Sequence, residues 1–259
     1  MKRKWIVLIM VIILTLAAVP AAYAITFGQP DGEGHPNVGA MIMRLDGEDY
    51  FICSGTLIAP DVFLTAAHCT AVPAAYGGEV FVTFETDIFG AALLPGTYYL
   101  NPDYGHDMHD LNDIAVIVLD EPVLDITPAE LPSLGLLDEM KADKELKGQE
   151  FVAVGYGELR DDKTGGPHAL SGEYGVRHFA EQTFLALKPY WLQISMNPST
   201  GSGGTCYGDS GGPHFLGDSN LVVSITVTGD TWCRATDVTY RLDTDSAQDY
   251  LRPFGVLPE

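Results

Sequence analysis

Residues 208–212 read Gly-Asp-Ser-Gly-Gly, and this stretch decides between two folds that both use a reactive serine. Serine is a weak nucleophile until a base removes its proton, so Ser210 needs a partner such as histidine. The surrounding glycines allow unusual backbone angles and let backbone N–H groups approach a substrate carbonyl. Gly, Asp and Ser also favour ordinary tight turns, so the stretch alone leaves both a catalytic and a structural interpretation open.

The same five residues fit the G-x-S-x-G nucleophile elbow of α/β-hydrolases, in which the acid and then the histidine follow the serine. Here His214 is the only histidine after Ser210. It lies four residues later, in the same turn region, where it cannot act as a separately positioned base. The elbow interpretation fails for this reason, and the base has to lie upstream.

The periodicity of the chain is that of strands, with short apolar or alternating runs between clusters of Gly, Pro, Asp and Asn. These runs are residues 38–45, 50–58, 80–84, 114–119, 151–154, 178–187, 191–196 and 221–227. Residues 128–149 form a candidate connection between two halves, and residues 160–175 a long surface loop. A short helix is expected to begin at Thr244. The pattern predicts antiparallel sandwiches or barrels and excludes βαβ units.

Two residues upstream of Ser210 are candidates for its catalytic partners. His68 ends an apolar segment beside Cys69, and a disulfide to Cys53 would hold the imidazole in place. Asp113 opens an apolar run, where a carboxylate is costly unless it has a partner. Each residue also has an ordinary interpretation, His68 as a structural histidine and Asp113 as a turn residue.

The N-terminus has the three parts of a secretory signal peptide. Residues 2–4 are basic, residues 5–19 are almost unbroken apolar, and residues 22–24 form a small-x-small cleavage site. The apolar run is shorter than the about 20 residues that a membrane span needs. We therefore expect residues 1–24 to be a cleaved leader and the mature chain, from Ile25 on, to be secreted to the extracellular space or periplasm.

The charge and the cysteines fit an exported protein without nucleic-acid or membrane partners. The chain has 35 acidic and 14 basic residues and a net charge of −21, which becomes −24 without the three basic residues of the leader. Such a surface disfavours nucleic acids and anionic membranes. Four cysteines in an exported chain indicate disulfides with three possible connectivities. Pairing of neighbours, Cys53 with Cys69 and Cys206 with Cys233, closes loops of modest length, and no CxxC or HxxxH spacing supports zinc.

Three motifs together resemble those of the chymotrypsin- and trypsin-like serine proteases. The family's histidine motif is similar to two stretches of this chain, Ser-Gly-Thr-Leu-Ile at 54–58 and Leu-Thr-Ala-Ala-His-Cys at 64–69. The aspartate motif is similar to Asn-Asp-Ile-Ala-Val at 112–116, and the serine motif to Cys-Tyr-Gly-Asp-Ser-Gly-Gly-Pro at 206–213. The motifs occur in the order of the family, and the resemblance covers nearly the whole mature chain. It identifies a bacterial-type secreted member of this family.

The resemblance implies an all-β fold of two six-stranded antiparallel barrels with a short C-terminal helix and the active site in the crevice between them. The first barrel is expected over about residues 25–135 and the second over about 145–259. The implied function is that of a monomeric serine endopeptidase that hydrolyses polypeptides through an acyl-enzyme, without metal or cofactor.

The resemblance also assigns a role to each candidate catalytic residue. His68 takes the proton of Ser210 and later donates it to the leaving amine, while Asp113 holds the imidazole. The N–H groups of Gly208 and Ser210 form the oxyanion hole.

In this family the residue before the nucleophile pairs with a newly exposed N-terminal ammonium, and the pair orders the oxyanion hole. Residues 25–28, Ile-Thr-Phe-Gly, resemble the family's Ile-Val-Gly-Gly terminus but differ at the second and third positions. Removal of the leader after residue 24 would expose Ile25 directly. We therefore expect Ile25 to pair with Asp209 without a further propeptide.

The resemblance places a primary specificity pocket that the disulfide between Cys206 and Cys233 would brace. The residues placed around it are Gly204, Ser224, Thr226 and Val238. Gly204 stands at the base, where trypsin-like members carry an acid, so a preference for Lys or Arg is not implied. Asp237 would face the pocket if the alignment shifted by one residue. With Thr226 narrowing the pocket, we expect small or medium apolar side chains before the scissile bond.

Other functions are also compatible with parts of the sequence. An inactive protease-like binding module usually lacks a triad residue or an oxyanion glycine, and none is missing here. A serine esterase on the same fold would carry the same triad. A metalloprotease could use His106 and His109, which have a ligand-like spacing, but this pair lies in an Asp-rich segment typical of a solvated loop.

Overall fold

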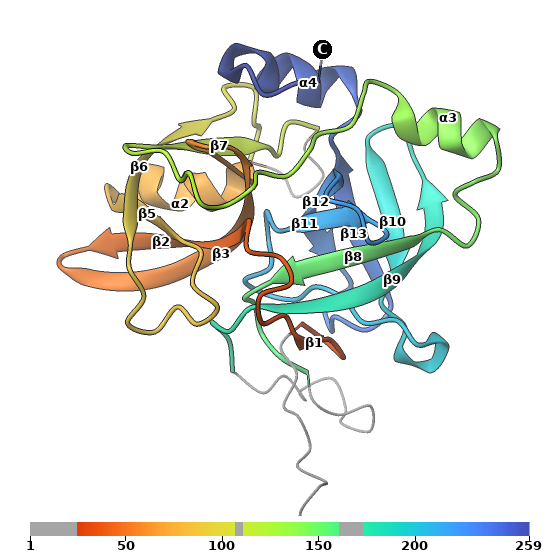
Figure 1. Cartoon of the computed structure of the whole chain (residues 1–259), viewed down its shortest axis with the longest axis horizontal. Coiled ribbons are helices and arrows are strands. Elements are labelled where there is room, and N and C mark those ends of the chain that lie inside the picture. The colour runs from red at the N-terminus through yellow and green to blue at the C-terminus, as the bar shows by residue number, and fades with distance from the viewer. Residues whose placement is uncertain (1–24, 107–110, 161–172, 259) are drawn as a thin grey trace, which may run out of the picture.

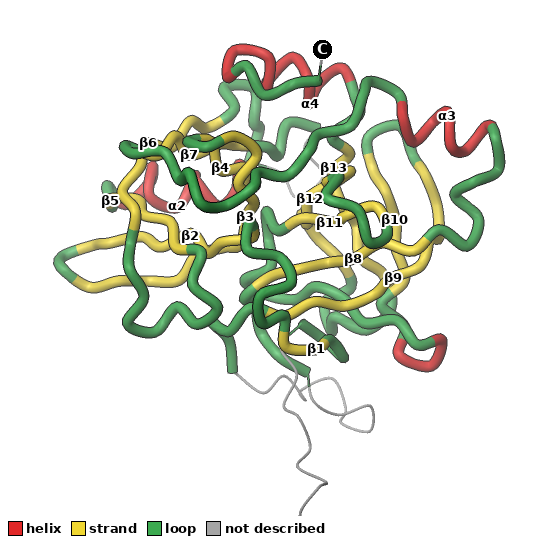
Figure 2. Tube along the Cα trace, in the orientation of Figure 1, coloured by secondary structure: helices red, strands yellow, loops and turns green. Residues whose placement is uncertain are grey.

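The structure, a computed structural model, describes residues 25–106, 111–160 and 173–258. The predicted leader and His109 lie outside the described residues. Strands make up most of the regular secondary structure of the described chain, and long loops connect them (Figure 2). No helix among the described residues is both long and apolar enough to cross a membrane.

Six antiparallel strands of the N-terminal half close into a barrel in the order β2-β3-β4-β7-β6-β5 (Figure 1). Their bounds are β2 Val38–Leu45, β3 Glu48–Ala59, β4 Val62–Thr65, β5 Glu79–Thr83, β6 Leu94–Leu100 and β7 Ala115–Leu119. Asp46 and Gly47 connect β2 and β3 with φ angles of 52° and 87°. Two consecutive positive φ angles are typical of a type I′ turn, which matches the twist of the flanking strands.

A second ring of strands follows in the C-terminal half. Its bounds are β8 Glu150–Gly155, β9 His178–Leu187, β10 Trp191–Ser195, β11 Pro213–Leu216, β12 Val222–Gly229 and β13 Thr236–Arg241. The order is β9-β10-β13-β12-β11-β8, and pairing of β9 with β8 closes the ring. The prediction of two six-stranded antiparallel barrels is confirmed. Buried apolar side chains of both barrels, such as Phe63 and Phe215, belong to one continuous cluster.

Among the described residues, three short helices connect or cover the barrels: α2 Ala67–Tyr76, α3 Leu136–Ala142 and α4 Asp245–Leu251. Single 3-10 turns are η1 Pro198–Thr200 and η2 Arg252–Phe254. The Thr244 side chain caps α4, which is the predicted C-terminal helix. Tyr250 of α4 reaches the first barrel, where its hydroxyl accepts from Val116 N–H at 3.1 Å and donates to the Tyr99 carbonyl. The C-terminal helix therefore ties the second half of the chain to the first.

The N-terminal segment makes the reverse connection. Strand β1, Gln29–Pro30, pairs with β9 of the second barrel before the chain enters the first. Beside it, Arg177 is fully buried and donates from Nε to Asp31 Oδ2 at 2.8 Å. The remaining acceptors of its guanidinium are Gly32 O, Val38 O, Phe84 O and Tyr156 Oη. Because these acceptors come from both halves, one buried cation holds the two barrels together.

Candidate active site

A cavity of about 320 Å³ lies where loops of the two halves meet. The first half contributes His68, Tyr104 and Asp113, and the second contributes Ser210. The other lining residues of the second half are Met196, Thr205, Cys206, Tyr207, Gly208, Thr226, Val227, Thr228, Gly229, Asp230, Thr231 and Cys233. The three candidate catalytic side chains, which come from distant parts of the sequence, therefore line one cavity.

His68 is held at the start of α2 by two hydrogen bonds to one carboxylate. Its Nδ1 lies 2.8 Å from Asp113 Oδ2, and its backbone N–H donates to Asp113 Oδ1 at 2.9 Å. Asp113 is fully buried just before β7, whereas about a third of the His68 side chain is exposed. An ionised carboxylate only accepts, so it fixes the neutral imidazole with its proton on Nδ1. The Nε2 atom of His68 is then left as a base.

Ser210 sits on a tight turn that only glycine permits at neighbouring positions. Gly208 and Gly211 have φ angles of 97° and 76°, and a Cβ on Gly211 would lie 2.1 Å from Thr65 Oγ1. The Ser210 carbonyl accepts from Ser54 N–H at 3.0 Å, which ties the turn to the first barrel. Within the described chain, the N–H groups of Gly208 and Ser210 have no intramolecular acceptor. Backbone donors are rarely left unpaired, so these two are available to a ligand in the cavity.

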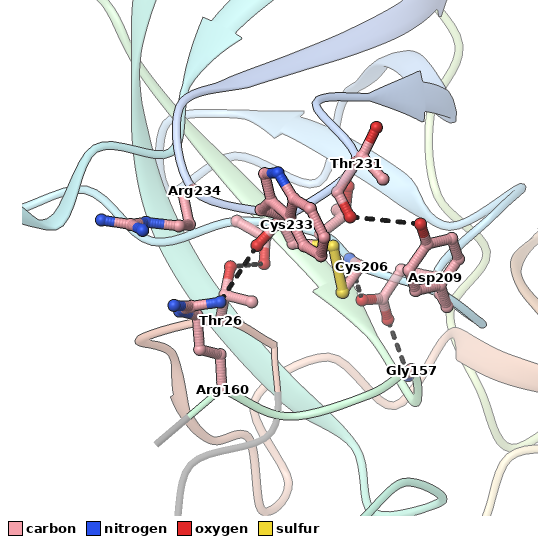
Figure 3. The surroundings of a disulfide bond; sticks show 12 residues. Thr26, Gly157, Arg160, Cys206, Asp209, Thr231, Cys233 and Arg234 are labelled. Carbon is pink, nitrogen blue, oxygen red and sulfur yellow. Dashed lines mark hydrogen bonds between the residues drawn. A yellow bond between two sulfur atoms is a disulfide. The ribbon is translucent and has the colours of Figure 1, made fainter. Parts of the chain in front are cut away.

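Asp209 points away from the cavity into the protein. It is fully buried, and its carboxylate accepts from the N–H groups of Gly157 and Cys206, each at 2.8 Å (Figure 3). Burial raises the pKa of Asp209 to about 7, because the hydrogen bonds only partly compensate the lost hydration. No cation pairs with it among the described residues.

Ile25 is buried, and it is joined to residue 24 by a peptide bond in the chain described. The adjacent Thr26 exchanges two backbone hydrogen bonds of 2.9 Å with Gly204, which places this segment beside the serine-bearing loop. No hydrogen bond or ion pair joins Ile25 to Asp209 in the described part of the molecule. The ion pair expected after cleavage therefore stays a prediction.

Both expected disulfides are present. Cys53 of β3 is bonded to Cys69, the residue after His68, and Cys206 is bonded to Cys233, both of which line the cavity. The second disulfide joins the serine-bearing loop to the segment that follows β12 (Figure 3). Tyr207 reinforces this link, because its hydroxyl donates to the Thr231 carbonyl at 3.2 Å.

Of the four residues expected around the specificity pocket, only Thr226 lines the cavity. Gly204 is covered by Met196, whose Cγ would lie 2.2 Å from a Cβ at this glycine. The side chain of Ser224 bonds to Thr239 Oγ1 at 2.8 Å within the sheet. Val238 lies on β13 as the partner of Thr228 and is not part of the lining.

A strip of β12 that the sequence motifs did not indicate continues along the cavity after Thr226. It consists of Val227, Thr228 and Gly229. The family motif calls for a glycine on this segment, and Gly229 lies three residues beyond the position where it was sought. Alignment on this glycine, four residues before the disulfide-bonded Cys233, would have identified the strip.

The chain is similar to known proteins in sequence and in fold. The family model described as "Trypsin" matches residues 30–247. A protein named "Trypsin" from Saccharopolyspora erythraea is 27% identical over 208 residues, which cover 78% of this chain and 85% of that protein. "Brachyurin" from Leptuca pugilator is 30% identical over 239 residues, covering 85% and 98% respectively.

Among solved structures, one titled "HL collagenase" is similar with a TM-score of 0.67 and 19% identity, covering 93% of this chain and all of that one. A second, titled "Structure of GrC", has a TM-score of 0.64 and 19% identity, with coverages of 89% and 99%. At this identity the two structures show the same fold.

Proposed function

The chain belongs to the trypsin family of serine endopeptidases, and on that premise we propose that it cuts polypeptides with Ser210, His68 and Asp113 as a catalytic triad. The observation that carries this proposal is the double hydrogen bond from His68 to the buried Asp113, in a cavity that Ser210 also lines. A histidine held in one orientation and one tautomer is what a general base for serine requires.

The proposed reaction begins when Ser210 Oγ attacks the carbonyl carbon of the scissile bond and His68 Nε2 takes the hydroxyl proton. Asp113 stabilises the imidazolium that forms. The unpaired N–H groups of Gly208 and Ser210 bind the developing oxyanion, and each such donor lowers the barrier by about 3–4 kcal/mol. His68 then donates its proton to the leaving amine. Water, activated by the same histidine, hydrolyses the acyl-enzyme and restores Ser210.

Ile25 and Asp209 are proposed to form the ion pair that orders this site. A buried carboxylate with two N–H donors and no cation is unfavourable in its charged form, as the raised pKa of Asp209 indicates. An ammonium brought to this carboxylate would compensate its charge. Cleavage after residue 24 would create that ammonium at Ile25, whose segment already lies beside Gly204.

The protein is further proposed to be a bacterial-type secreted enzyme with residues 1–24 as its signal peptide. Two disulfides suit an extracellular or periplasmic location, because thiols stay reduced in the cytosol. We propose that residues 25–259 form one catalytic domain that acts as a monomer, with barrels over about 25–135 and 145–259. Its strongly negative charge gives nucleic acids and anionic membranes no attraction.

One experiment tests the proposed activity. The secreted protein and its Ser210→Ala variant are incubated with a diverse peptide mixture, and cut sites are mapped by mass spectrometry. Loss of Ser210 is expected to reduce cleavage by on the order of 10⁴-fold or more, and Asp113→Asn by about 10⁴-fold. Cleavage that survives in the Ser210→Ala variant would exclude the mechanism. An acyl burst with an activated ester but no cut peptide would identify an esterase. If neither the ester nor any peptide reacts, the protein would be an inactive binding module.

A further inference from the structure

Ser54 of β3 is a buried residue of the first barrel that binds the catalytic turn at two points. It is completely shielded from solvent. Its Oγ donates to the Gly208 carbonyl at 3.0 Å, and its backbone N–H donates to the Ser210 carbonyl at 3.0 Å. Gly208 and Ser210 are the two residues whose own N–H groups are available to a ligand in the cavity. Ser54 therefore holds the backbone of both candidate oxyanion donors.

The direction of the hydrogen bond from Ser54 to Gly208 is fixed by a third group. Tyr156, which follows β8 of the second barrel, donates its N–H to Ser54 Oγ at 3.0 Å. A hydroxyl has one proton and a carbonyl oxygen only accepts, so the Ser54 proton lies between Oγ and the Gly208 oxygen. With both roles of the hydroxyl in use, its orientation has no alternative.

Ser54 is itself held in place by its neighbours. The preceding residue, Cys53, is bonded to Cys69, which follows the candidate base. The Ser54 carbonyl accepts from Thr65 Oγ1 at 2.9 Å. Two glycines pack against its side chain, since a Cβ on Gly155 would lie 3.0 Å from Ser54 Oγ and one on Gly212 would lie 3.2 Å from Ser54 Cβ. The hydroxyl is therefore a fixed point from which the turn can be oriented.

Gly208 is the part of the turn that needs this support. Its φ angle is 97°, and without a Cβ the two peptide units that flank it rotate at little steric cost. The unit before it is held by Glu158, whose N–H donates to the Tyr207 carbonyl at 2.7 Å. The unit after it is held by the Ser54 hydroxyl, and no other group of the described chain donates to the Gly208 carbonyl. The first unit carries the Gly208 N–H, and the second sets the path of the chain to the Ser210 N–H.

We propose that Ser54 is a positioning residue for the reaction, whose hydroxyl fixes the peptide unit after Gly208 and so keeps the two oxyanion donors aimed at the substrate carbonyl. This inference rests on the proposed endopeptidase function. The donors bind the oxyanion of the transition state far more strongly than the neutral carbonyl of the bound substrate. Loss of the hydroxyl is therefore expected to lower kcat and to leave KM nearly unchanged.

Kinetics on Ser54→Ala test this expectation, with a peptide chosen from the cut sites of the wild type. Water cannot take the place of Oγ in this variant, because that position lies one bond length from Cβ. Removal of a whole oxyanion donor costs about 10²–10³-fold in kcat, and a donor that is present but loosely held is expected to cost on the order of 10-fold, with KM within about 2-fold. The control Ser246→Ala removes a hydroxyl of α4 that lies 2.7 Å from Tyr240 Oη, and it is expected to change neither constant.

A covalent adduct measures the oxyanion hole directly. Ser210 Oγ adds to the carbonyl carbon of a peptidyl trifluoromethyl ketone, the serine proton passes to His68, and the former carbonyl oxygen becomes an oxyanion. Donors aimed at this oxygen make the hemiketal more acidic, and its titration is followed by fluorine NMR. Ser54→Ala is expected to lower the acid dissociation constant of the hemiketal by about 10-fold, in line with the loss in kcat, and Ser246→Ala is expected to leave it unchanged.

The outcomes separate a positioning role from a merely structural one. A lower kcat at unchanged KM together with a less acidic hemiketal would support the role of Ser54. Unchanged acidity of the hemiketal would overturn it, even if urea denaturation shows that Ser54→Ala is less stable. If Ser54→Ala does not fold, Ser54→Gly removes the same hydroxyl and is judged by the same measurements. Absence of Ser210-dependent peptide cleavage in the wild type would overturn the endopeptidase function instead, and the hemiketal would still decide on Ser54.

Discussion

Asp209 offers a direct test of the proposed activation, because its ionisation is expected to destabilise the chain until Ile25 has a free amine. In the uncleaved chain burial raises the pKa of Asp209 to about 7 from 3.8. The folded state therefore holds the proton more tightly than the unfolded state does. The stabilising contribution of the protonated form is complete below about pH 4 and is lost as pH rises toward 7. The side chain that replaces it in Asp209→Asn cannot ionise, so this variant is expected not to lose stability as pH rises.

The size of the effect follows from the shift. About three pKa units at 1.36 kcal/mol per unit correspond to about 4 kcal/mol of lost stability between pH 4 and pH 8. No discount for solvent screening applies, because the carboxylate of Asp209 is fully buried. After cleavage before Ile25, an ammonium beside the carboxylate favours its charged form and lowers the pKa again. The chain that starts at Ile25 is therefore expected to lack the loss.

Urea denaturation measures this free energy, with Ser210→Ala as the common background to prevent self-digestion. Four proteins are compared from pH 4 to pH 8: the chain with an uncleavable extension before Ile25, the chain that starts at Ile25, and each of these with Asp209→Asn. Other groups titrate equally in each matched pair, so the difference between Asp209 and Asn isolates the one carboxyl group. The reasoning would be refuted if, in the extended chain, the difference in unfolding free energy between the chain with Asp209 and its Asp209→Asn variant did not change from pH 4 to pH 8. It would also be refuted if this difference changed equally with pH in both chain forms.

Three further predictions concern the contacts that hold the two barrels together. Arg177→Met leaves Asp31 without its guanidinium and is expected to lower the free energy of unfolding by about 3–5 kcal/mol, measured in urea at pH 7. Burial alone would raise the pKa of Asp31, but hydrogen bonds from His35 and Arg177 and the charge of His35 lower it. The ionised Asp31 is therefore expected to stabilise the fold above about pH 4, and this stabilisation is expected to be lost as pH falls further. Acid titrations followed by fluorescence measure the loss, which Asp31→Asn should abolish. Tyr250→Phe removes the bonds to β6 and β7 and is expected to cost about 1–3 kcal/mol, whereas the control Tyr190→Phe should cost little.

The fold could be predicted from the sequence because the strands that carry it have simple local patterns. The runs expected at 38–45 and 178–187 coincide with β2, Val38–Leu45, and β9, His178–Leu187. The candidate triad was likewise accessible, since His68, Asp113 and Ser210 each stand in a short motif. No single motif predicts that these three side chains line one cavity; the prediction comes from the three motifs occurring together in the order of the family.

Strand β6, Leu94–Leu100, shows why other parts were missed. Its residues alternate between half-buried and exposed, and it contains Pro95 and Gly96, which weaken the strand pattern. The glycine is nevertheless required, because a Cβ on Gly96 would lie 2.7 Å from Ile117 Cγ2 on the neighbouring strand. Helix α3 was missed in a similar way inside the stretch expected to be only a connection. In both cases packing against distant residues decides the local structure.

The specificity pocket shows the same limit at the level of function. Inspection of Gly204 alone gives a pocket without an acid, and packing explains the glycine, because Met196 occupies the space that a side chain would need. The pocket has two sides, however, joined by the disulfide between Cys206 and Cys233. The register of β12 and β13 sets Asp237 opposite Gly229, which lines the cavity, while the Asp237 side chain itself is buried outside the lining. The shape of the pocket therefore depends on how residues from several strands pack around it, and one position at its base is not sufficient to predict which side chain it accepts.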